Sequence, residues 1–186
     1  MQQLMRWVVN VVSVPSAAEE AVPEPAFVYR HVVSFEETNV VGNVYFTRHI
    51  SWQGRCREMF LKEKAPEILA EINRDLRLVT LRASCEYFEE LTAFDEIEVQ
   101  LRLAHLRQHR IGLDFDVVKL NPTGSLCAAH GFQELACMRA TNGGLLPIRA
   151  PAVLVDALTP FASGFGAIVQ SVSSRKASGP DKCVDA

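Results

Sequence analysis

Apolar residues recur at every second position along the second half of the chain. The alternating residues are Ile97, Val99, Leu101 and Leu103 in one segment, and Leu113, Phe115 and Val117 in the next. This period of two is typical of strands that bury one face. With the apolar segments on either side, it predicts four consecutive strands at residues 77–88, 96–105, 110–120 and 125–140. Turn residues separate them, including Asn-Pro-Thr-Gly at 121–124, and Asn-Gly-Gly at 142–144 ends the last strand.

The first half of the chain follows a different pattern. Residues 27–35 are rich in β-branched and aromatic side chains and predict a first strand, with a loop at 36–43. Residues 44–64 lack proline and predict a long helix. Its apolar residues at helical spacing are Trp52, Cys56, Met59 and Phe60.

Two shorter elements complete the picture. Pro66 can open a short helix at 66–72, and residues 147–161 are consistent with a closing helix or an extended cap. Because helices do not alternate with strands, the order favours an α+β class over an open α/β sheet. We expect a hotdog fold, in which an antiparallel five-stranded sheet, formed as a meander, wraps around a long central helix. Such a sheet leaves an edge uncovered, so we also expect a homo-oligomer, either a dimer or a tetramer.

The ends of the chain lack this patterning. We expect an N-terminal leader and linker at 1–25, a folded domain at 26–162 and a mobile C-terminal tail, rich in Ser, Gly and Ala, at 163–186. The first 14 residues loosely resemble a secretory signal, but their apolar run is interrupted by Asn10 and carries a single basic residue, Arg6. We therefore favour a cytoplasmic protein.

Composition excludes several classes of function. The chain has 186 residues, a net charge of -3 and no apolar stretch of the roughly 18 residues that span a bilayer, so we expect neither nucleic acid nor membrane as a partner. Its five cysteines form no CxxC pair. His105 and His109 stand four apart, but in a predicted strand, where this spacing makes no helical ligand pair. We expect no metal and no cofactor.

The GxSxG, GxxxxGK[ST], GxGxxG and HExxH motifs are absent from the sequence. Their absence argues against an α/β-hydrolase and against a nucleotide-phosphate site.

Most of the candidate catalytic residues lie in the segment 35–57. The spacing there follows D-x-D-x-x-G-x-V-[YW] and then W-x-x-x-x-R, carried by Glu37, Asn39, Gly42, Val44, Tyr45, Trp52 and Arg57. This segment resembles the hotdog thioesterases of the 4-hydroxybenzoyl-CoA type, and most closely their enediyne-biosynthesis branch, over about residues 27–139. The resemblance implies a thioesterase that releases a polyene from the acyl carrier protein of an iterative polyketide synthase, without a cofactor.

Asn39 is a departure from the wider family, which has a nucleophilic or basic aspartate at this position. A carboxamide cannot take up a proton as a general base, but it can orient a water molecule or the thioester carbonyl. The alternative is a structural role, with the Asn39 side chain capping its own loop in an Asx-turn.

Three backbone groups next to Asn39 are candidates for an oxyanion site. Gly42, Asn43 and Val44 stand at the start of the predicted helix, where unpaired N–H groups and the helix dipole favour negative charge. Gly42 is also explained by a turn that requires glycine.

Arg55 and Arg57 point about 200° apart on a helix, so only one can face a given site. The resemblance selects Arg57 as the catalytic cation, pointing back toward the loop. A solvated position or an ion pair with Glu58 or Glu63 is the alternative for either arginine. For the acyl chain we expect an apolar channel beside the helix. Candidate substrate-binding residues are Tyr45, Phe46 and Ile50, with Thr80 and Arg82 on one side of the next strand.

Four other reactive side chains have simpler interpretations. Glu36 and Glu37 are predicted to be solvent-facing loop acids, in preference to a general base. His49 is expected to pack or to be exposed, and Cys56 to be a small buried thiol.

The resemblance implies hydrolysis of a polyene β-ketoacyl or β-hydroxyacyl thioester on a carrier protein, with decarboxylation to a methyl-ketone polyene as a further step. A general acyl-CoA thioesterase and a non-catalytic acyl-chain binding protein stay open as alternatives. A hotdog dehydratase would need a His–carboxylate pair, and the sequence reveals no matching one.

Overall fold

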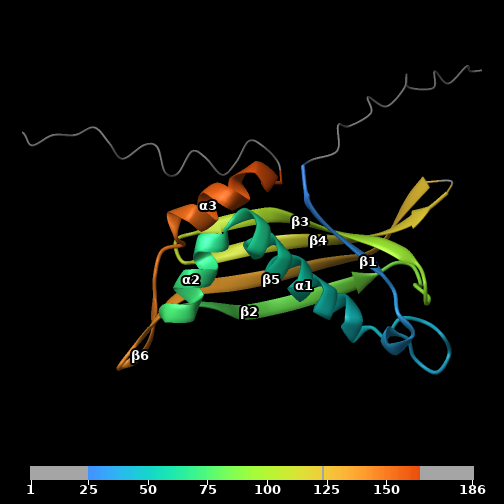
Figure 1. Cartoon of the computed structure of the whole chain (residues 1–186), viewed down its shortest axis with the longest axis horizontal. Helices are drawn as coiled ribbons and strands as arrows, with labels where there is room; N and C mark the ends of the chain where they lie inside the picture. Colours follow the sequence, from blue (N-terminus) through green and yellow to red (C-terminus); the bar gives the residue numbers. More distant parts are fainter. Residues whose placement is uncertain (1–24, 123, 164–186) are drawn as a thin grey trace, which may run out of the picture.

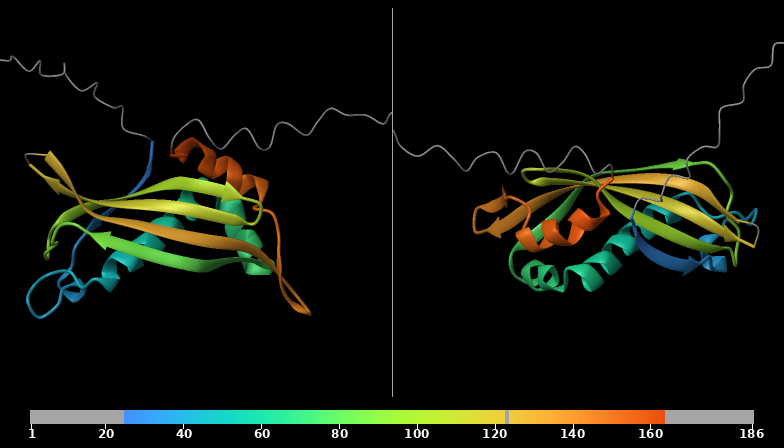
Figure 2. Two further views of the ribbon diagram at one scale, coloured as in Figure 1. Left: turned by 180° about the vertical axis from the view of Figure 1, so that it is seen from behind. Right: turned by 90° about the horizontal axis from the view of Figure 1, so that it is seen from above.

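A computed structural model describes residues 25–122 and 124–163, and the predicted leader and tail lie outside this part apart from their inner boundary residues. One curled antiparallel sheet packs against the long helix α1 (Thr47–Lys64), as Figure 1 shows. The strands are β1 (Phe27–Val32), β2 (Leu76–Tyr87), β3 (Glu96–Arg107), β4 (Arg110–Asn121), β5 (Gly124–Thr141) and β6 (Gly144–Pro147). The views in Figure 2 show α1 on one face of the sheet and the opposite face bare of helices. The predicted α+β hotdog fold is confirmed.

The strand order corrects the predicted meander. The order in space is β1-β3-β4-β5-β2, so β2 pairs with β5 and not with its neighbour in sequence, β3. Helix α1 has 18 residues and a length of about 27 Å, which carries the chain across the sheet before β2 begins. A sixth strand, β6, pairs with the end of β5 through the Asn-Gly turn that was expected to end the sheet.

The core lies between α1 and the concave face of the sheet. The inward residues of β3 and β4 that alternate in the sequence are at most 2% exposed. From α1 they meet Trp52, Cys56 and Phe60. The Cys56 thiol donates a hydrogen bond to the carbonyl of Val99 at 3.4 Å, and burial raises the pKa of this thiol to about 12. Its interpretation as a small buried thiol is confirmed.

Two boundaries near the motif at residues 37–57 differ from the prediction. β1 ends at Val32 rather than at residue 35, and a short 3₁₀ helix, Phe35–Glu37, follows it. Helix α1 begins at Thr47 rather than at residue 44, because residues 38–46 fold into a loop of their own. This segment, 38–46, is called the motif loop below.

The remaining helices cover one end of the sheet. Helix α2 (Pro66–Arg74) starts at its proline as predicted, and α3 (Ala152–Leu158) is the closing helix. Within the described part of the chain, no helix combines the length and the apolarity that a membrane crossing requires.

Candidate functional site

Glu37 clamps the base of the motif loop to the long helix. Its carboxylate accepts hydrogen bonds from His31 Nε2 at 2.8 Å, from Trp52 Nε1 at 2.7 Å and from the Ser34 backbone N–H at 2.8 Å. The residue is only 7% exposed. The prediction of a solvent-facing acid is therefore wrong for Glu37, although Glu36 is exposed as expected. The 3₁₀ turn, in place of the extended chain assumed from sequence, directs Glu37 inward.

The hydrogen bonds keep Glu37 ionised. Burial on its own would raise the pKa of this carboxyl, but the bonds from Ser34, His31 and Trp52 outweigh burial and hold the pKa below its ordinary value. His31 and Glu37 form a His–carboxylate pair that the sequence did not reveal. Because donors already occupy both oxygens, Glu37 is suited to holding the loop rather than to taking a proton from substrate.

Asn39 caps the motif loop through its side-chain oxygen. Oδ1 accepts the backbone N–H groups of Val41 at 2.9 Å and of Asn43 at 3.3 Å. This is the Asx-type capping named above as the structural alternative. Because the backbone donors fix which side-chain atom is the oxygen, Nδ2 points away from these bonds and has no acceptor within the described residues. The arrangement leaves Asn39 one N–H₂ group to offer to a ligand.

The expected oxyanion donors are already engaged. Gly42 N–H donates to the Asn39 carbonyl at 3.0 Å, Asn43 N–H to Asn39 Oδ1, and Val44 N–H to the Leu91 carbonyl at 2.8 Å. The premise that these three groups are unpaired at the helix start is therefore wrong, since the helix begins three residues later. Gly42 has a φ of +94°, which supports its interpretation as a turn glycine.

The true start of α1 offers two other donors. The backbone N–H groups of Phe46 and Thr47 meet no acceptor within the described residues. They stand at the positive end of an 18-residue helix. This end of the helix is suited to a partial negative charge, as the sequence predicted, but through different residues.

Arg57 lies at a distance from the motif loop. It stands ten positions into α1 from Thr47, which is about 15 Å along the axis. Its Nη1 donates to Gln133 Oε1 at 2.7 Å and to Thr80 Oγ1 at 3.3 Å, so within one chain it points across to the sheet and not back to the loop. Arg55 is exposed and pairs with Glu58 at 3.3 Å, which agrees with the predicted divergence of the two arginines.

Two buried glutamines, Gln133 and Gln53, form a series of hydrogen bonds that begins at Arg57. Neither of them was predicted from the sequence. Gln133 is 3% exposed and donates through Nε2 to Gln53 Oε1 at 3.3 Å. Gln53 is fully buried and donates through Nε2 to the Ser84 carbonyl at 3.2 Å. A Cβ atom on Gly131 would collide with the Gln53 amide, so glycine makes room for this chain. One feature of the sequence could have identified Gln133. It stands two positions after Gly131 in a predicted strand, so both residues lie on the same face, where a polar glutamine is unusual if that face is buried.

Thr80 and Arg82 do not share one side of β2. A β-bulge between them shifts the alternation by one residue, which turns the two side chains to opposite faces. Thr80 contacts Arg57 on the inner face, whereas the Arg82 guanidinium lies 5.7 Å from the ring centroid of Phe132. The prediction that both line one acyl channel is wrong for Arg82.

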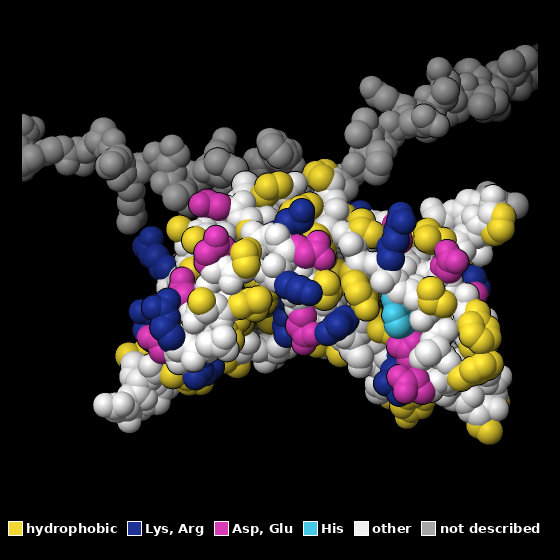
Figure 3. Space-filling view, in the orientation of Figure 1, with side chains coloured by type: hydrophobic (Ala, Val, Ile, Leu, Met, Phe, Trp, Pro, Cys, Tyr) yellow, Lys and Arg dark blue, Asp and Glu magenta, His cyan; other side chains and the backbone are white. Residues whose placement is uncertain are grey.

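The other predicted substrate residues lie near the motif loop. Tyr45 and Phe46 are exposed, and Ile50 is half-buried on the first turns of α1. They belong to a set of exposed apolar side chains at this end of the molecule, here called the apolar end patch: Phe35, Val40, Val41, Tyr45, Phe46, Tyr87, Phe88 and Phe94. Figure 3 shows hydrophobic side chains gathered at this end. So much exposed apolar surface is typical of a binding or assembly surface.

His49 packs beneath this patch, as one of its two interpretations expected. Its ring lies between Trp52 and Tyr87, with centroids 5.0 Å from each. Burial lowers the pKa of His49, so the imidazole is neutral near pH 7.

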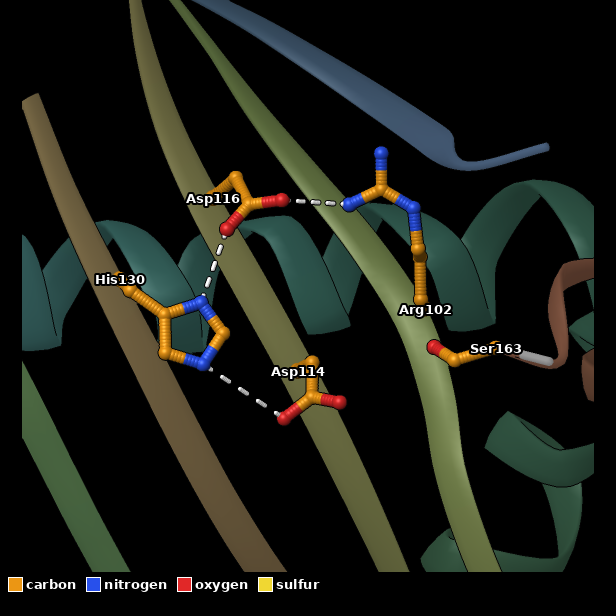
Figure 4. A pocket seen from close by; sticks show the side chains of 5 residues that line it. All are labelled: Arg102, Asp114, Asp116, His130 and Ser163. Carbon is orange, nitrogen blue, oxygen red and sulfur yellow. Dashed lines mark hydrogen bonds and ion pairs between the residues drawn. The ribbon is translucent and has the colours of Figure 1, made fainter. Parts of the chain in front are cut away.

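The opposite face of the sheet carries a separate charged pocket of about 320 Å³ (Figure 4), lined by Arg102, Asp114, Asp116, His130 and Ser163. Arg102 Nη1 lies 2.6 Å from Asp116 Oδ2, and His130 Nδ1 lies 2.8 Å from Asp116 Oδ1. Both Arg102 and His130 thus contact the carboxylate of Asp116. Figure 4 shows α1 behind the sheet from this side, which separates the pocket from Arg57.

Comparison with known proteins gives a consistent result. Residues 33–165 match the thioesterase-like superfamily. A protein of Aquifex aeolicus (strain VF5), provisionally named an esterase, is 31% identical over 93 residues, which are 50% of this chain and 73% of that protein. The dynemicin thioesterase, whose crystal structures show induced-fit and allosteric effects upon polyene binding, is 44% identical with a TM-score of 0.73, over 75% of this chain and 99% of that one.

A more distant structure shows the same fold. The 1,4-dihydroxy-2-naphthoyl-CoA thioesterase of Synechocystis is 19% identical with a TM-score of 0.61, over 73% of this chain and 96% of that one. The family match includes the motif loop, α1 and the whole sheet beyond β1. The resemblance stated from the motif is thereby confirmed. The chain belongs to the thioesterase-like superfamily and is a thioester hydrolase of the hotdog fold.

Proposed function

We propose that the protein hydrolyses a polyene β-ketoacyl or β-hydroxyacyl thioester carried on the acyl carrier protein of an iterative polyketide synthase, in enediyne antibiotic biosynthesis. The observation that carries the proposal is the 44% identity to the dynemicin thioesterase over nearly all of that protein. The site supports it, because Asn39 stands at the motif position and Glu37, a buried carboxylate near the same loop, already accepts hydrogen bonds at both oxygens.

In the proposed reaction, a water molecule attacks the thioester carbonyl and forms a tetrahedral oxyanion. Asn39 Nδ2 donates a hydrogen bond to this oxygen or orients the carbonyl, and Arg57 supplies positive charge. Collapse of the intermediate breaks the carbon–sulfur bond and expels the carrier protein's thiolate. The thiolate takes up the proton that the attacking water loses, and the free acid remains. A free β-keto acid then loses carbon dioxide to give a methyl ketone.

A second copy of the chain completes the proposed site. Strand β2 is an edge strand of 12 residues with no partner on its outer side within residues 25–122 and 124–163. It ends beside the motif loop, where Tyr87 Oη donates to the Phe46 carbonyl at 3.0 Å, while its middle contacts Arg57 through Thr80. Antiparallel pairing of two β2 strands would therefore bring the loop of one copy toward Arg57 of the other. A dimer, alone or paired into a tetramer, is the proposed assembly.

Three parts of the site have proposed roles in binding. The apolar end patch and Ile50 would hold the polyene, and Thr80 would border it next to Arg57. The N–H groups of Phe46 and Thr47, in place of those of Gly42, Asn43 and Val44, are the helix-end donors available to the thioester oxygen. No metal or cofactor enters this proposal.

The test is incubation of the protein with polyene-loaded carrier protein, with released products identified by mass spectrometry. We expect free acid or methyl ketone well above the rate without protein, and much slower release from the same acyl group on coenzyme A. The Arg102→Ala variant, altered only on the opposite face of the sheet, is the matched control and should retain activity. Faster release from coenzyme A would indicate a general acyl-CoA thioesterase, and binding without release would indicate a non-catalytic carrier of acyl chains.

Sedimentation at micromolar concentration tests the assembly. We expect a dimer or a tetramer, and a stable, active monomer would contradict the shared site.

A further inference from the structure

Arg57 is held by neutral groups. Its two side-chain partners are the amide oxygen of Gln133 at 2.7 Å and the hydroxyl of Thr80 at 3.3 Å, and no carboxylate lies within ion-pair distance of it in the described part of the chain. Burial lowers the pKa of Arg57, but a guanidinium stays protonated in proteins. Its positive charge is therefore fixed in position without being neutralised.

The orientation of Gln133 is set by a one-directional series of hydrogen bonds. The Ser84 carbonyl can only accept, so Gln53 must present its Nε2 to Ser84 and its Oε1 to Gln133. Gln133 then presents Nε2 to Gln53 and Oε1 to Arg57. Both amides are at least 97% buried and are therefore held in this arrangement, since reversing either one would leave buried polar atoms unpaired.

We propose that Gln133 is a positioning residue for thioester hydrolysis, which fixes the Arg57 guanidinium at the oxyanion while leaving its charge uncompensated. This inference rests on the proposed role of Arg57. A glutamate at the same place could hold the guanidinium equally well, but its negative charge would oppose the developing oxyanion. Gln53 supports the arrangement from behind by fixing which end of the Gln133 amide faces Arg57.

A double-mutant cycle tests this role. Wild type, Gln133→Leu, Arg57→Ala and the double variant are compared by steady-state hydrolysis of the polyene thioester on its carrier protein. Leucine preserves much of the volume and removes the acceptor. We expect Gln133→Leu to lower kcat about ten-fold, with little change in KM, because a guanidinium displaced by a fraction of an ångström stabilises the transition state less well. In the Arg57→Ala background the same change should have no further effect on kcat.

The Gln133→Glu variant distinguishes the position of the Arg57 guanidinium from its charge, because it keeps an acceptor for Arg57 and adds a negative charge beside it. It retains an acceptor for Arg57 but loses the donor to Gln53. We therefore expect a protein that circular dichroism finds folded and whose kcat is nonetheless lowered at least as much as in Gln133→Leu. If circular dichroism finds Gln133→Leu unfolded, this variant decides, and wild-type kcat in folded Gln133→Glu overturns the proposal. The matched control is Gln100→Leu, a glutamine on β3 that bonds to Arg102 and Glu98 rather than to Arg57.

The possible failures are distinguishable. An Arg57→Ala variant as active as wild type would overturn the proposed catalytic role itself. Suppose instead that Arg57→Ala lowers kcat as expected. Then wild-type kcat in Gln133→Leu, or an equal loss from Gln133→Leu in both backgrounds, would overturn only the positioning role of Gln133.

Discussion

Arg57 and Arg102 are both partly buried arginines next to the same sheet, but their surroundings differ. Arg102, on the face away from α1, bonds to the carboxylate of Asp116 at 2.6 Å and to Gln100 at 3.0 Å. Arg57, which extends from α1 toward β5, donates hydrogen bonds to the amide oxygen of Gln133 and the hydroxyl of Thr80. The charge of Arg102 is thus compensated inside the protein, whereas that of Arg57 is available to a ligand. The comparison indicates which face of the sheet is built for a developing negative charge.

The carboxylates of the two faces follow the same division. Near the motif loop, Glu37 accepts hydrogen bonds from His31, Trp52 and both the backbone and the hydroxyl of Ser34, and its pKa is lowered. On the other face, Asp114 lies beside Asp116 and His130, and burial, with the nearby Asp116 charge, raises the pKa of Asp114 despite opposing cations. Glu37 therefore has a structural role, whereas Asp114 and Asp116 lie on the outer face of the sheet beside His130.

The largest expected effect comes from Asn39. Asn39→Ala should lower turnover of the carrier-bound polyene about 100-fold, as removal of a single oxyanion donor typically does. The Asn39→Asp variant extends the comparison, because it adds a negative charge on the α1 side of the sheet. We expect its turnover to be no higher than that of wild type. Single-turnover release of acid or ketone is the measurement, with circular dichroism to verify folding. Wild-type rates in a folded Ala variant would remove Asn39 from the mechanism.

Replacement of Arg57 tests the comparison directly. Arg57→Ala should lower turnover at least ten-fold, about 1.4 kcal/mol of transition-state stabilisation, because an uncompensated charge near the oxyanion is lost. Arg55→Ala is the matched control on the same helix, and its effect should be much smaller because Arg55 is exposed and paired with Glu58. Equal effects, or the reverse order, would show that the wrong arginine has been assigned.

Glu37→Gln is expected to change stability more than chemistry. The unfolding free energy at pH 7 should fall by about 1–3 kcal/mol, since a buried charge-assisted set of hydrogen bonds is weakened. Because the folded state lowers the pKa of Glu37, its contribution is present above the ordinary pKa of 4.5 and is lost as pH falls through the folded value. Urea unfolding at several pH values should thus show the two proteins converging in acid. A constant difference down to pH 3 would contradict the assigned linkage.

The smallest effect is expected at Arg102. Arg102→Ala leaves Asp116 paired with His130 and changes nothing that contacts Arg57, so turnover should stay within about two-fold of wild type. Kinetics with the carrier-bound polyene provide the check. A large loss of activity would mean that the two faces of the sheet are coupled. It would contradict the inference that only the α1 side of the sheet contributes to turnover.

Local patterns in the sequence determined much of this molecule. The period of two along β3 and β4, the proline-free helical stretch and the turn residues predicted the strands and helices to within a few positions, because each reports on its immediate neighbours. The motif at 37–57 selected Asn39 and Arg57, and the divergence of Arg55 from Arg57 followed from helical geometry alone.

Only the tertiary structure decided what those residues meet. Gln133 lies 76 positions from Arg57 and Gln53 lies 80 positions from Gln133, so no local pattern could join them. The bulge that separates Thr80 from Arg82 and the inward turn of Glu37 likewise depend on β5 and on α1. The Val44 N–H is occupied by the carbonyl of Leu91, which is also distant in the sequence. Periodicity indicates which face of an element a side chain occupies. Which groups share that face is decided by packing between elements far apart in the chain.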